Sequence, residues 1–314
     1  MDRIGVVGGG MIGASMACLF AGHGVQVVLV ERDGFLEKAQ ANCESIFGDL
    51  IAKNLMTAEQ KDICLSYISF STDYAKLDPM EFIFECVFER TPVKHEVYAQ
   101  LEAHCHHIRA IASSTSAISA DELAAGFQTD MRSCLVVAHP WNPPHLAPCV
   151  ELVKSQCVSE DAVKLVEQTL TKMGKKTITL EKNIPGFIGN RLQYAMLREA
   201  IHIVEEGAAT PQMVDDTLKY SFAPRYTEIG IFEHFDNCGQ DLTADICKYL
   251  FPDLCDEKTV QRSLQKNLDN GNLGVKSGKG MLDWSGVDIR AFRDRAASPY
   301  YRFFDWELPT EKAK

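Results

Sequence analysis

The chain has 314 residues, 43 of them acidic and 32 basic, and its formal net charge is -11. This length predicts about two domains, and a content of 46% hydrophobic and 24% charged residues is typical of a globular protein rather than a disordered one. Duplex nucleic acid is bound through clustered Lys and Arg, and no such cluster occurs, so nucleic acid is excluded as the main partner. Because no run of about 18 apolar residues occurs, we also expect no membrane-spanning segment.

The eleven cysteines are scattered along the chain and form no C-x-x-C pair. A zinc site needs paired ligand spacings, and a disulfide framework belongs to short secreted chains, so we expect neither a metal nor a disulfide. Most cysteines lie in apolar runs, where cysteine behaves as a small core residue. This usage is typical of a reducing compartment and predicts a cytoplasmic protein.

The first half of the chain alternates short apolar runs with amphipathic stretches, the pattern of a parallel sheet flanked by helices. The apolar runs are rich in Val, Ile and Phe and predict buried strands at residues 3–7, 25–31, 82–88, 108–113 and 135–139. The stretches between them predict helices near residues 12–23, 35–53, 57–65, 92–103 and 119–125. Asp33 and Thr57 are predicted helix N-caps, and Gln60 suits a capping box with Thr57.

The pattern changes at a Pro-Gly turn signal, residues 185–186. A long helical run follows over residues 190–206, and Gly207 stands directly after it, as expected of a helix C-cap. The apolar spacing beyond this point is helical, with few candidate strands. We therefore predict an α/β domain over residues 1–185 and an all-helical domain over residues 186–314.

Residues 8–13, Gly-Gly-Gly-Met-Ile-Gly, match the dinucleotide-binding pattern G-x-G-x-x-G. Their context is the one this pattern needs, because a predicted strand precedes them and a predicted helix follows. A second predicted strand then ends at Glu31, 23 residues after Gly8. A tight strand-to-helix turn without a ligand would explain the glycines alone, but not all of these elements in register. The pattern therefore predicts a Rossmann-like doubly wound sheet that binds a dinucleotide.

Each position of this turn has a chemical role. Gly8 allows the tight turn, Gly10 lets the backbone approach a pyrophosphate, and Gly13 lets the helix pack closely on the strand. The start of the helix, at Met11 and Ile12, then offers free N–H groups to the phosphates.

Glu31 is placed to accept hydrogen bonds from the adenosine ribose hydroxyls. Because a carboxylate there repels a 2′-phosphate, we predict NAD rather than NADP as the cofactor. The neighbouring Arg32 favours the opposite choice and leaves NADP open.

His139 ends a predicted strand, and Glu151 follows twelve residues later. A single histidine is more often a structural residue than a base, but the carboxyl edge of a parallel sheet is where doubly wound folds bind ligands. Oxidation of an alcohol requires a base for the hydroxyl proton. A histidine held in one tautomer by a carboxylate suits this task at neutral pH. His139 is therefore the candidate base and Glu151 its candidate partner.

Together these motifs resemble the 3-hydroxyacyl-CoA dehydrogenase family, and the resemblance extends over essentially the whole chain. It is also carried by residues 85–89 with Lys94, and by residues 113–116, 185–191 and 274–280. The resemblance implies a Rossmann-like domain followed by a helical one, NAD as cofactor, and a homodimer formed through the helical domain.

The same resemblance implies roles for single residues. His139 would be the general base, Glu151 would orient it, and Ser116 and Asn190 would bind the oxygen atoms of the substrate. Considered without the resemblance, Ser116 suits a turn or an N-cap and Asn190 suits the N-cap of the long helix.

The resemblance further implies that Glu89 and Lys94 flank the cofactor, with Ser116 beside it. Considered alone, Glu89 and Lys94 suit the exposed start of a helix.

Two segments depart from the acyl-CoA type of this family. Residues 140–145 and residues 223–230 are more similar to the branch that contains L-gulonate 3-dehydrogenase and lambda-crystallin. One further departure is Ile231, which stands where a proline is usual.

Within the second segment, Arg225 is a candidate ligand for a free carboxylate, because a planar guanidinium grips a carboxylate with two hydrogen bonds whereas a thioester carries no charge. The alternative is a salt bridge from Arg225 to Glu228 or to an acidic residue of the dimer partner. Residues 45–66 hold Lys53 and Lys61 but little other positive charge, although the 3′-phosphate of CoA favours a basic surface.

These observations predict an NAD-dependent oxidoreductase that oxidises the 3-hydroxyl of a small, L-gulonate-like 3-hydroxy carboxylic acid. The first alternative is an L-3-hydroxyacyl-CoA dehydrogenase, such as a 3-hydroxybutyryl-CoA enzyme. The second alternative is a structural or sensor protein that binds NAD without catalysis. The presence of all four candidate catalytic residues argues against it.

Overall fold

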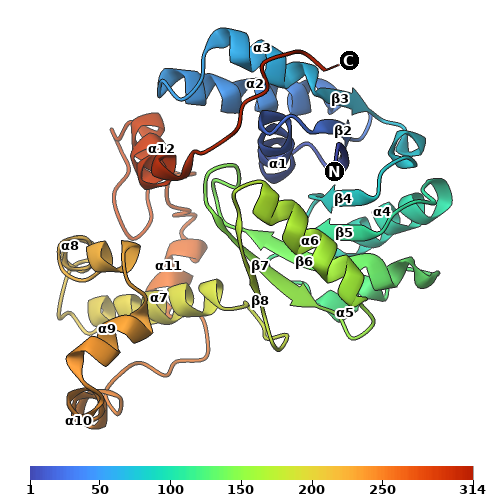
Figure 1. The fold of residues 1–314 in the computed structure, drawn as a ribbon. Coiled ribbons are helices and arrows are strands. Elements are labelled where there is room, and N and C mark those ends of the chain that lie inside the picture. Colours follow the sequence, from blue (N-terminus) through green and yellow to red (C-terminus); the bar gives the residue numbers. More distant parts are fainter. Residues whose placement is uncertain (314) are drawn as a thin grey trace. The chain divides into compact units, whose positions relative to one another are not determined.

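The computed structural model describes residues 1–313, which form two compact units (Figure 1). Unit 1 comprises Met1–Ile188 together with Arg295–Lys314, and unit 2 comprises Gly189–Asp294. The C-terminal residues therefore return to the first unit, although the pattern of the sequence predicts a helical domain that continues to residue 314. The reason is apolar burial, because Trp306 is buried in the core of unit 1.

Unit 1 is built on an eight-stranded sheet with the order β3-β2-β1-β4-β5-β6-β7-β8. The strands are β1 (Arg3–Val7), β2 (Gln26–Val30), β3 (Ile68–Ser71), β4 (Phe82–Glu85), β5 (Ala110–Ser113), β6 (Leu135–Pro140), β7 (Cys149–Lys154) and β8 (Lys176–Thr179). The pairings from β3 to β6 are parallel, β7 is antiparallel to β6, and β8 is parallel to β7. The five predicted strands are all present, and β3, β7 and β8 are additional to them.

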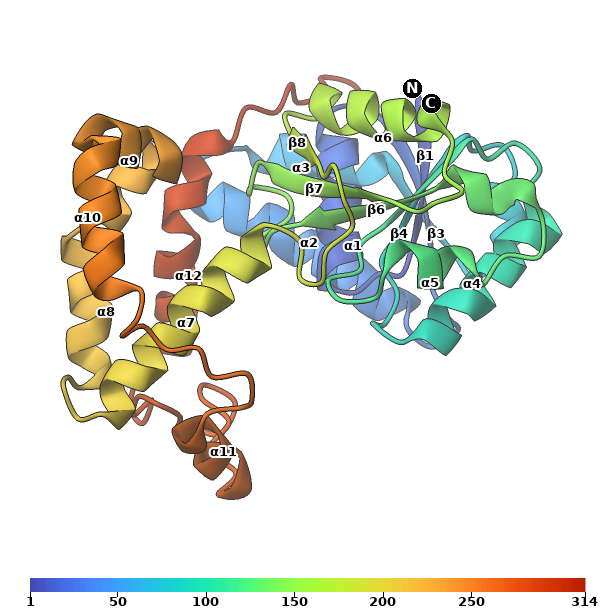
Figure 2. The ribbon, with the colours of Figure 1, turned by 90° about the horizontal axis from the view of Figure 1, so that it is seen from below.

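Helices cover both faces of this sheet (Figure 2). They are α1 (Met11–Gly22), α2 (Leu36–Ala52), α3 (Ala58–Ser66), α4 (Thr91–His104), α5 (Ala120–Ala124) and α6 (Glu160–Lys172), with the short 3-10 helices η1 (Tyr74–Leu77), η2 (Asp130–Cys134) and η4 (Ser298–Phe303). Side chains of α1, α2, α3 and α6 contribute to one buried apolar cluster, and those of η1, α4 and α5 contribute to another. A sheet buried on both faces explains the continuous apolar runs of its strands. The predicted Rossmann-like fold is confirmed.

The start of α3 is capped as predicted, because the Thr57 hydroxyl accepts a hydrogen bond from the Gln60 N–H and the Gln60 side chain accepts one from the Thr57 N–H. The N-cap predicted at Asp33 is wrong. Helix α2 begins at Leu36, and the Asp33 carboxylate accepts a hydrogen bond from the N–H of Gly34 instead. A local loop hydrogen bond therefore takes the place of the cap.

Unit 2 is helical, as predicted. It contains α7 (Gly189–Glu205), α8 (Pro211–Tyr220), η3 (Ala223–Thr227), α9 (Ile231–Cys238), α10 (Gln240–Leu250) and α11 (Arg262–Asp269), and α12 (Ile289–Ala297) leads from it back into unit 1. After α7, Gly207 adopts φ +73° and Ala208 N–H donates to Ile203 O, so Gly207 ends the helix as predicted. Among the described helices, none is long and apolar enough to cross a membrane.

Candidate active site

The glycine turn between β1 and α1 has the shape that a dinucleotide requires. Gly8 adopts φ +96°, and a Cβ added to Gly13 would lie 1.8 Å from the carbonyl oxygen of Gly8, so neither position tolerates a side chain. A Cβ added to Gly10 would meet no atom within 4 Å, so the backbone there faces open space. Helix α1 begins at Met11, which leaves the N–H groups of Met11 and Ile12 without partners inside the helix. These residues fit a pyrophosphate.

Glu31 follows β2 and lies beside this turn. Its carboxylate accepts hydrogen bonds from Gly9 N–H at 2.8 Å and Arg32 N–H at 2.7 Å. The guanidinium of Arg32 lies over the rings of Phe35 and Phe88, 4.7 and 5.5 Å from their centroids. The acidic side chain predicted to meet the ribose is therefore held in place by the backbone of the glycine turn.

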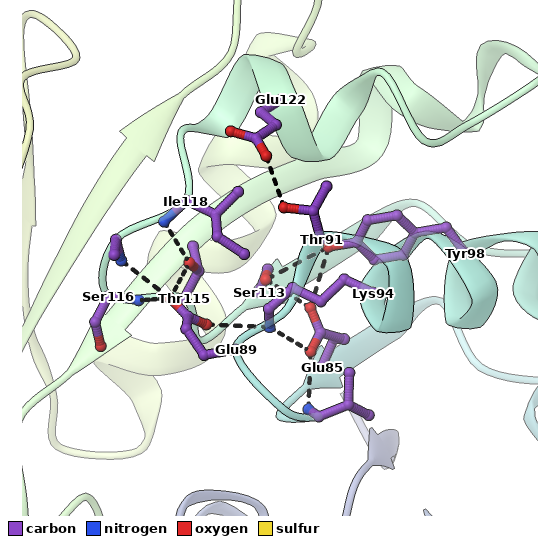
Figure 3. Close-up of polar contacts among 12 residues, drawn as sticks. Glu85, Glu89, Thr91, Lys94, Tyr98, Ser113, Thr115, Ser116, Ile118 and Glu122 are labelled. Atoms are coloured by element: carbon purple, nitrogen blue, oxygen red, sulfur yellow. Dashed lines mark hydrogen bonds and ion pairs between the residues drawn. The ribbon is translucent and has the colours of Figure 1, made fainter.

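A buried polar network begins at the carboxyl end of β4 (Figure 3). The fully buried carboxylate of Glu85 accepts hydrogen bonds from Lys94 Nζ at 2.8 Å, Ser113 Oγ at 2.6 Å, Tyr98 OH at 3.1 Å and Val87 N–H at 2.9 Å. Burial and the Glu85 carboxylate raise the pKa of Tyr98 well above its ordinary value, so Tyr98 remains a hydrogen-bond donor. Donors from β5 and α4 thus converge on one carboxylate.

Lys94 is fully buried in this network. Its ammonium group is paired with Glu85 and lies 3.7 Å from Glu89 Oε2. The prediction that Lys94, considered alone, lies at the exposed start of a helix is therefore wrong. Its burial depends on acceptors from β4 and from the loop that follows it, which helical periodicity does not reveal.

Sequence reasoning gave no role to Glu85, Tyr98 or Ser113, although Glu85 and Ser113 lie in segments that carry the resemblance. A signal was available in the sequence, because a buried strand that ends in Glu, with Lys nine residues later, indicates a buried ion pair.

Glu89 holds the turn that contains Ser116 (Figure 3). Its Oε1 atom accepts hydrogen bonds from the Thr115 hydroxyl at 2.6 Å and from the N–H groups of Ser116 at 2.8 Å and Ala117 at 3.0 Å. Burial raises the pKa of Glu89, but these hydrogen bonds and the charge of Lys94 outweigh burial and hold the pKa below its ordinary value. Glu89, Lys94 and Ser116 are therefore brought together at the ends of β4 and β5.

Ser116 is a turn residue and not an N-cap, since Ser119 caps α5 through the N–H of Glu122. Asn190 lies in unit 2 as the second residue of α7 and is therefore not the N-cap of that helix.

His139 and Glu151 are direct cross-strand partners in the antiparallel pair of β6 and β7. Both side chains are buried, and His139 Nδ1 lies 3.0 Å from Glu151 Oε2. The second oxygen of Glu151 accepts a hydrogen bond from Ile188 N–H at 2.8 Å. Because an ionised carboxylate only accepts hydrogen bonds, this geometry places the imidazole proton on Nδ1 and leaves Nε2 as the acceptor.

Aromatic rings pack against this histidine. The centroid of the His139 ring lies 5.7 Å from that of Trp141 and 5.4 Å from that of Phe187. These contacts fix the orientation of the imidazole and exclude water from part of its surface.

Arg225 lies on η3 of unit 2 and is exposed. Its Nη1 atom is 3.3 Å from both ring nitrogens of His234, so the guanidinium lies against the imidazole face. The sequence did not indicate this neighbour.

All eleven cysteines are free thiols. Within residues 1–313, no group of three or more His, Cys, Asp or Glu side chains is placed to hold a metal ion. Residues 104–107 read His-Cys-His-His, and within this segment His106 Nδ1 is paired with Asp78 Oδ1, 2.9 Å away.

Comparison with known proteins identifies the class. Residues 3–184 match the NAD-binding domain of 3-hydroxyacyl-CoA dehydrogenase, and residues 186–284 match the C-terminal domain of the same family. Lambda-crystallin of Oryctolagus cuniculus is 34% identical over 73% of this chain and 72% of its own length. An L-carnitine dehydrogenase/betainyl-CoA thioesterase of Rhizobium meliloti is 30% identical over 76% of this chain, which spans 47% of that protein.

Among solved structures, 5-formyl-3-hydroxy-2-methylpyridine 4-carboxylic acid 5-dehydrogenase, an NAD+-dependent dismutase, is similar with a TM-score of 0.85 and 25% identity, over 97% of this chain and 96% of that one. The fold and the matched domains define an NAD-dependent oxidoreductase. The chain belongs to the 3-hydroxyacyl-CoA dehydrogenase family, and NAD is its cofactor.

Proposed function

We propose that this protein oxidises the 3-hydroxyl group of a small, free, L-gulonate-like 3-hydroxy carboxylic acid, with His139 as general base. The observation that carries the proposal is the buried His139–Glu151 pair at the carboxyl end of β6. This edge of the sheet is also the edge of the glycine turn, because β1 and β6 run in the same direction.

In this mechanism, the Glu151 carboxylate accepts a hydrogen bond from the Nδ1–H of His139, and it accepts a second one from Ile188 N–H, which holds Glu151 in place. Nε2 of His139 then accepts the proton of the substrate hydroxyl, and the imidazolium that forms is stabilised by the Glu151 carboxylate. When bound, NAD would accept the hydride that leaves the carbon carrying this hydroxyl group. Ser116 and Asn190 bind the substrate oxygen atoms and Glu89 flanks the cofactor, as the resemblance implies. Lys94, which the resemblance also assigns to the cofactor site, is fully buried and acts there through its pairing with Glu85 and Glu89.

A panel of substrates tests this function. Purified protein is assayed with NAD and NADP against free 3-hydroxy acids, including L-gulonate, and against 3-hydroxyacyl-CoA thioesters. We expect NADH formation with a free acid. Turnover of thioesters alone would establish the acyl-CoA alternative, which the name of the family favours. NAD binding without turnover of any compound would establish the non-catalytic alternative.

Two of the relatives support a free acid, because their names identify L-carnitine and a pyridine carboxylic acid as substrates. A probable 3-hydroxybutyryl-CoA dehydrogenase of Deinococcus radiodurans, 29% identical over 90% of this chain, supports the thioester alternative. In the present chain, Arg225 is the candidate ligand for the carboxylate, and its position against His234 leaves a planar guanidinium on the surface of η3.

Substitution Arg225→Ala is expected to raise KM for the free acid by about 10–100-fold, the value of a charge-assisted pair of hydrogen bonds, while kcat changes less. Steady-state kinetics measure both parameters. Arg290→Ala, which removes another exposed arginine of unit 2, is the matched control. An unchanged KM for Arg225→Ala would contradict a role in carboxylate binding.

Substitution Glu31→Gln is expected to raise KM for NAD by about tenfold, because the acceptor for the ribose hydroxyls loses its charge. We also expect the preference for NAD over NADP to fall, because the repelling carboxylate is lost while Arg32 remains beside the position that a 2′-phosphate would occupy. Asp33→Asn removes a nearby exposed carboxylate and serves as the control. If Glu31→Gln and Asp33→Asn had the same cofactor preference, Glu31 would not select the cofactor.

We also infer a homodimer formed through unit 2. Among the described residues of unit 2, only Ile201 is buried, whereas Tyr220, Phe232 and Tyr249 are 84%, 83% and 87% exposed. A unit with so few buried residues and so many exposed large apolar side chains is expected to bury some of them against a partner. Sedimentation velocity is expected to give about twice the 35.0 kDa mass of the chain, and a monomer at micromolar concentration would contradict the inference.

We place the protein in the cytoplasm. Eleven free thiols, several of them fully buried, are compatible with a reducing compartment. Imaging of the tagged full chain would test this assignment.

A further inference from the structure

A buried lysine, Lys175, is hydrogen-bonded to the loop that joins β6 to β7. Lys175 is 5% exposed, and its Nζ atom donates hydrogen bonds to the carbonyl oxygens of Pro144 at 2.7 Å and Ala147 at 3.0 Å. Burial lowers the pKa of Lys175 to about 7, and the charge of Asp305 opposes this shift. Burying the charged amino group of a lysine costs free energy unless the group is paired, so a buried lysine at this position indicates a structural or functional role.

The same loop is attached to the cofactor helix. His145 Nδ1 lies 3.3 Å from the hydroxyl of Ser15, a buried residue of α1 two positions after Gly13. Burial and the neighbouring Lys175 lower the pKa of His145 to about 3, which keeps the imidazole neutral and able to share a hydrogen bond with Ser15. The loop therefore contacts α1, the helix whose first N–H groups would face the pyrophosphate of a bound dinucleotide.

The C-terminal residues complete this arrangement within unit 1. Trp306 is buried, and the centroid of its ring lies 6.4 Å from that of His145. It packs so closely on the end of α1 that a Cβ added to Gly22 would lie 2.2 Å from the indole. Asp305 lies against Gly174, directly before Lys175, because a Cβ added to Gly174 would lie 2.8 Å from its carboxylate. Both residues lie beyond residue 284, where the family match ends.

This loop matters because it joins the two strands that carry His139 and Glu151. Trp141, at the beginning of the loop, packs edge-on against the His139 ring. With two carbonyl groups held by one ammonium and His145 held against α1, the loop has little freedom to move. A base displaced by about 1 Å can lose about 10²-fold in rate, so loop position bears directly on the reaction.

We propose that Lys175 is a positioning residue for His139, and that the C-terminal residues support it through Asp305, which lies against Gly174, and through Trp306, which packs against His145 of the same loop. Its ammonium group fixes the 141–148 loop, and with it Trp141 and the imidazole that Trp141 packs against. This inference rests on the proposed function of His139 and adds to it a role for residues outside the matched family domains.

The test compares Lys175→Met with Lys176→Met, which makes the same substitution at the adjacent exposed lysine. We expect Lys175→Met to lower kcat by about 10–100-fold with little change in KM or in the NAD dissociation constant, because the base is misplaced while both binding surfaces persist. Lys176→Met is expected to retain wild-type kcat. Assays are run at a temperature at which circular dichroism shows each variant folded, so that a loss of stability alone does not lower kcat.

If Lys175→Met does not fold, a second pair of variants tests the positioning role of Lys175. Asp305→Asn removes the carboxylate that favours the ammonium form of Lys175, whereas Glu307→Gln makes the same change two residues on, beside His23 rather than Lys175. We expect kcat to fall in Asp305→Asn and not in Glu307→Gln.

Wild-type kcat in folded Lys175→Met, or in Asp305→Asn when Lys175→Met is unfolded, would overturn the positioning role. That result leaves the proposed function intact if the wild-type enzyme oxidises a 3-hydroxy compound. A wild-type protein without activity on the whole substrate panel would overturn both.

Discussion

Replacing His139 by glutamine is expected to lower kcat by about 10²–10⁴-fold while NAD binding is retained. Glutamine has nearly the size of histidine but cannot accept the hydroxyl proton. Since His139 lies opposite Glu151 and not in the glycine turn, the cofactor surface stays intact. The measurement is NADH absorbance under saturating substrate, together with NAD titration by calorimetry.

The control for this variant is His107→Gln, the same substitution at an exposed histidine, which is expected to retain wild-type kcat. Glu151→Gln should also lose activity, because an amide at this position no longer stabilises the imidazolium. Full activity in His139→Gln would rule out His139 as the base, whatever the substrate.

Replacing Lys94 by methionine is expected to lower the free energy of unfolding by about 3–5 kcal/mol. In the wild-type protein, Lys94 Nζ lies 2.8 Å from Glu85 Oε1, so the substitution leaves the fully buried Glu85 carboxylate without its cation. Equilibrium unfolding in urea, followed by circular dichroism, measures the loss.

The double variant Lys94→Met/Glu85→Gln separates charge from packing. If the loss comes from an unpaired charge, the double variant recovers part of it, because no buried anion remains. Lys76→Met, on the solvent side of η1, is the control and should change stability by less than about 0.5 kcal/mol. A single variant as stable as wild type, or a double variant with the sum of both losses, would contradict a buried ion pair of this importance.

The sequence predicted five of the six interior strands of the sheet and neither edge strand; the interior strand that it missed is β7, which is buried like the others. Strands β1, β2, β4, β5 and β6 are buried on both faces, so their continuous apolar runs are visible in the sequence. Strands β3 and β8 lie at the two edges of the sheet and contain Ser, Thr and Lys. Their strand conformation depends on pairing with distant segments, which local composition does not encode.

In the candidate site, too, some features were predictable from the sequence and others were not. The glycine turn was predictable because its geometry depends on six consecutive residues. The Glu151 partner of His139 was also proposed, and the two side chains lie within hydrogen-bond distance. The burial of Lys94 was missed because it depends on two glutamates outside its helix. The contact between Arg225 and His234 likewise depends on how η3 packs on α9.

The return of residues 295–314 to unit 1 makes unit 2 an insertion, enclosed between two stretches of the chain that share one core. During synthesis, the cofactor-binding unit therefore cannot complete its core until Trp306 has been translated and has left the ribosome, long after its last strand has been made. A chain shortened at its C-terminus would therefore impair unit 1, which contains the N-terminus, before it impairs unit 2. Synthesis begins with unit 1, but unit 2 is complete before unit 1 is.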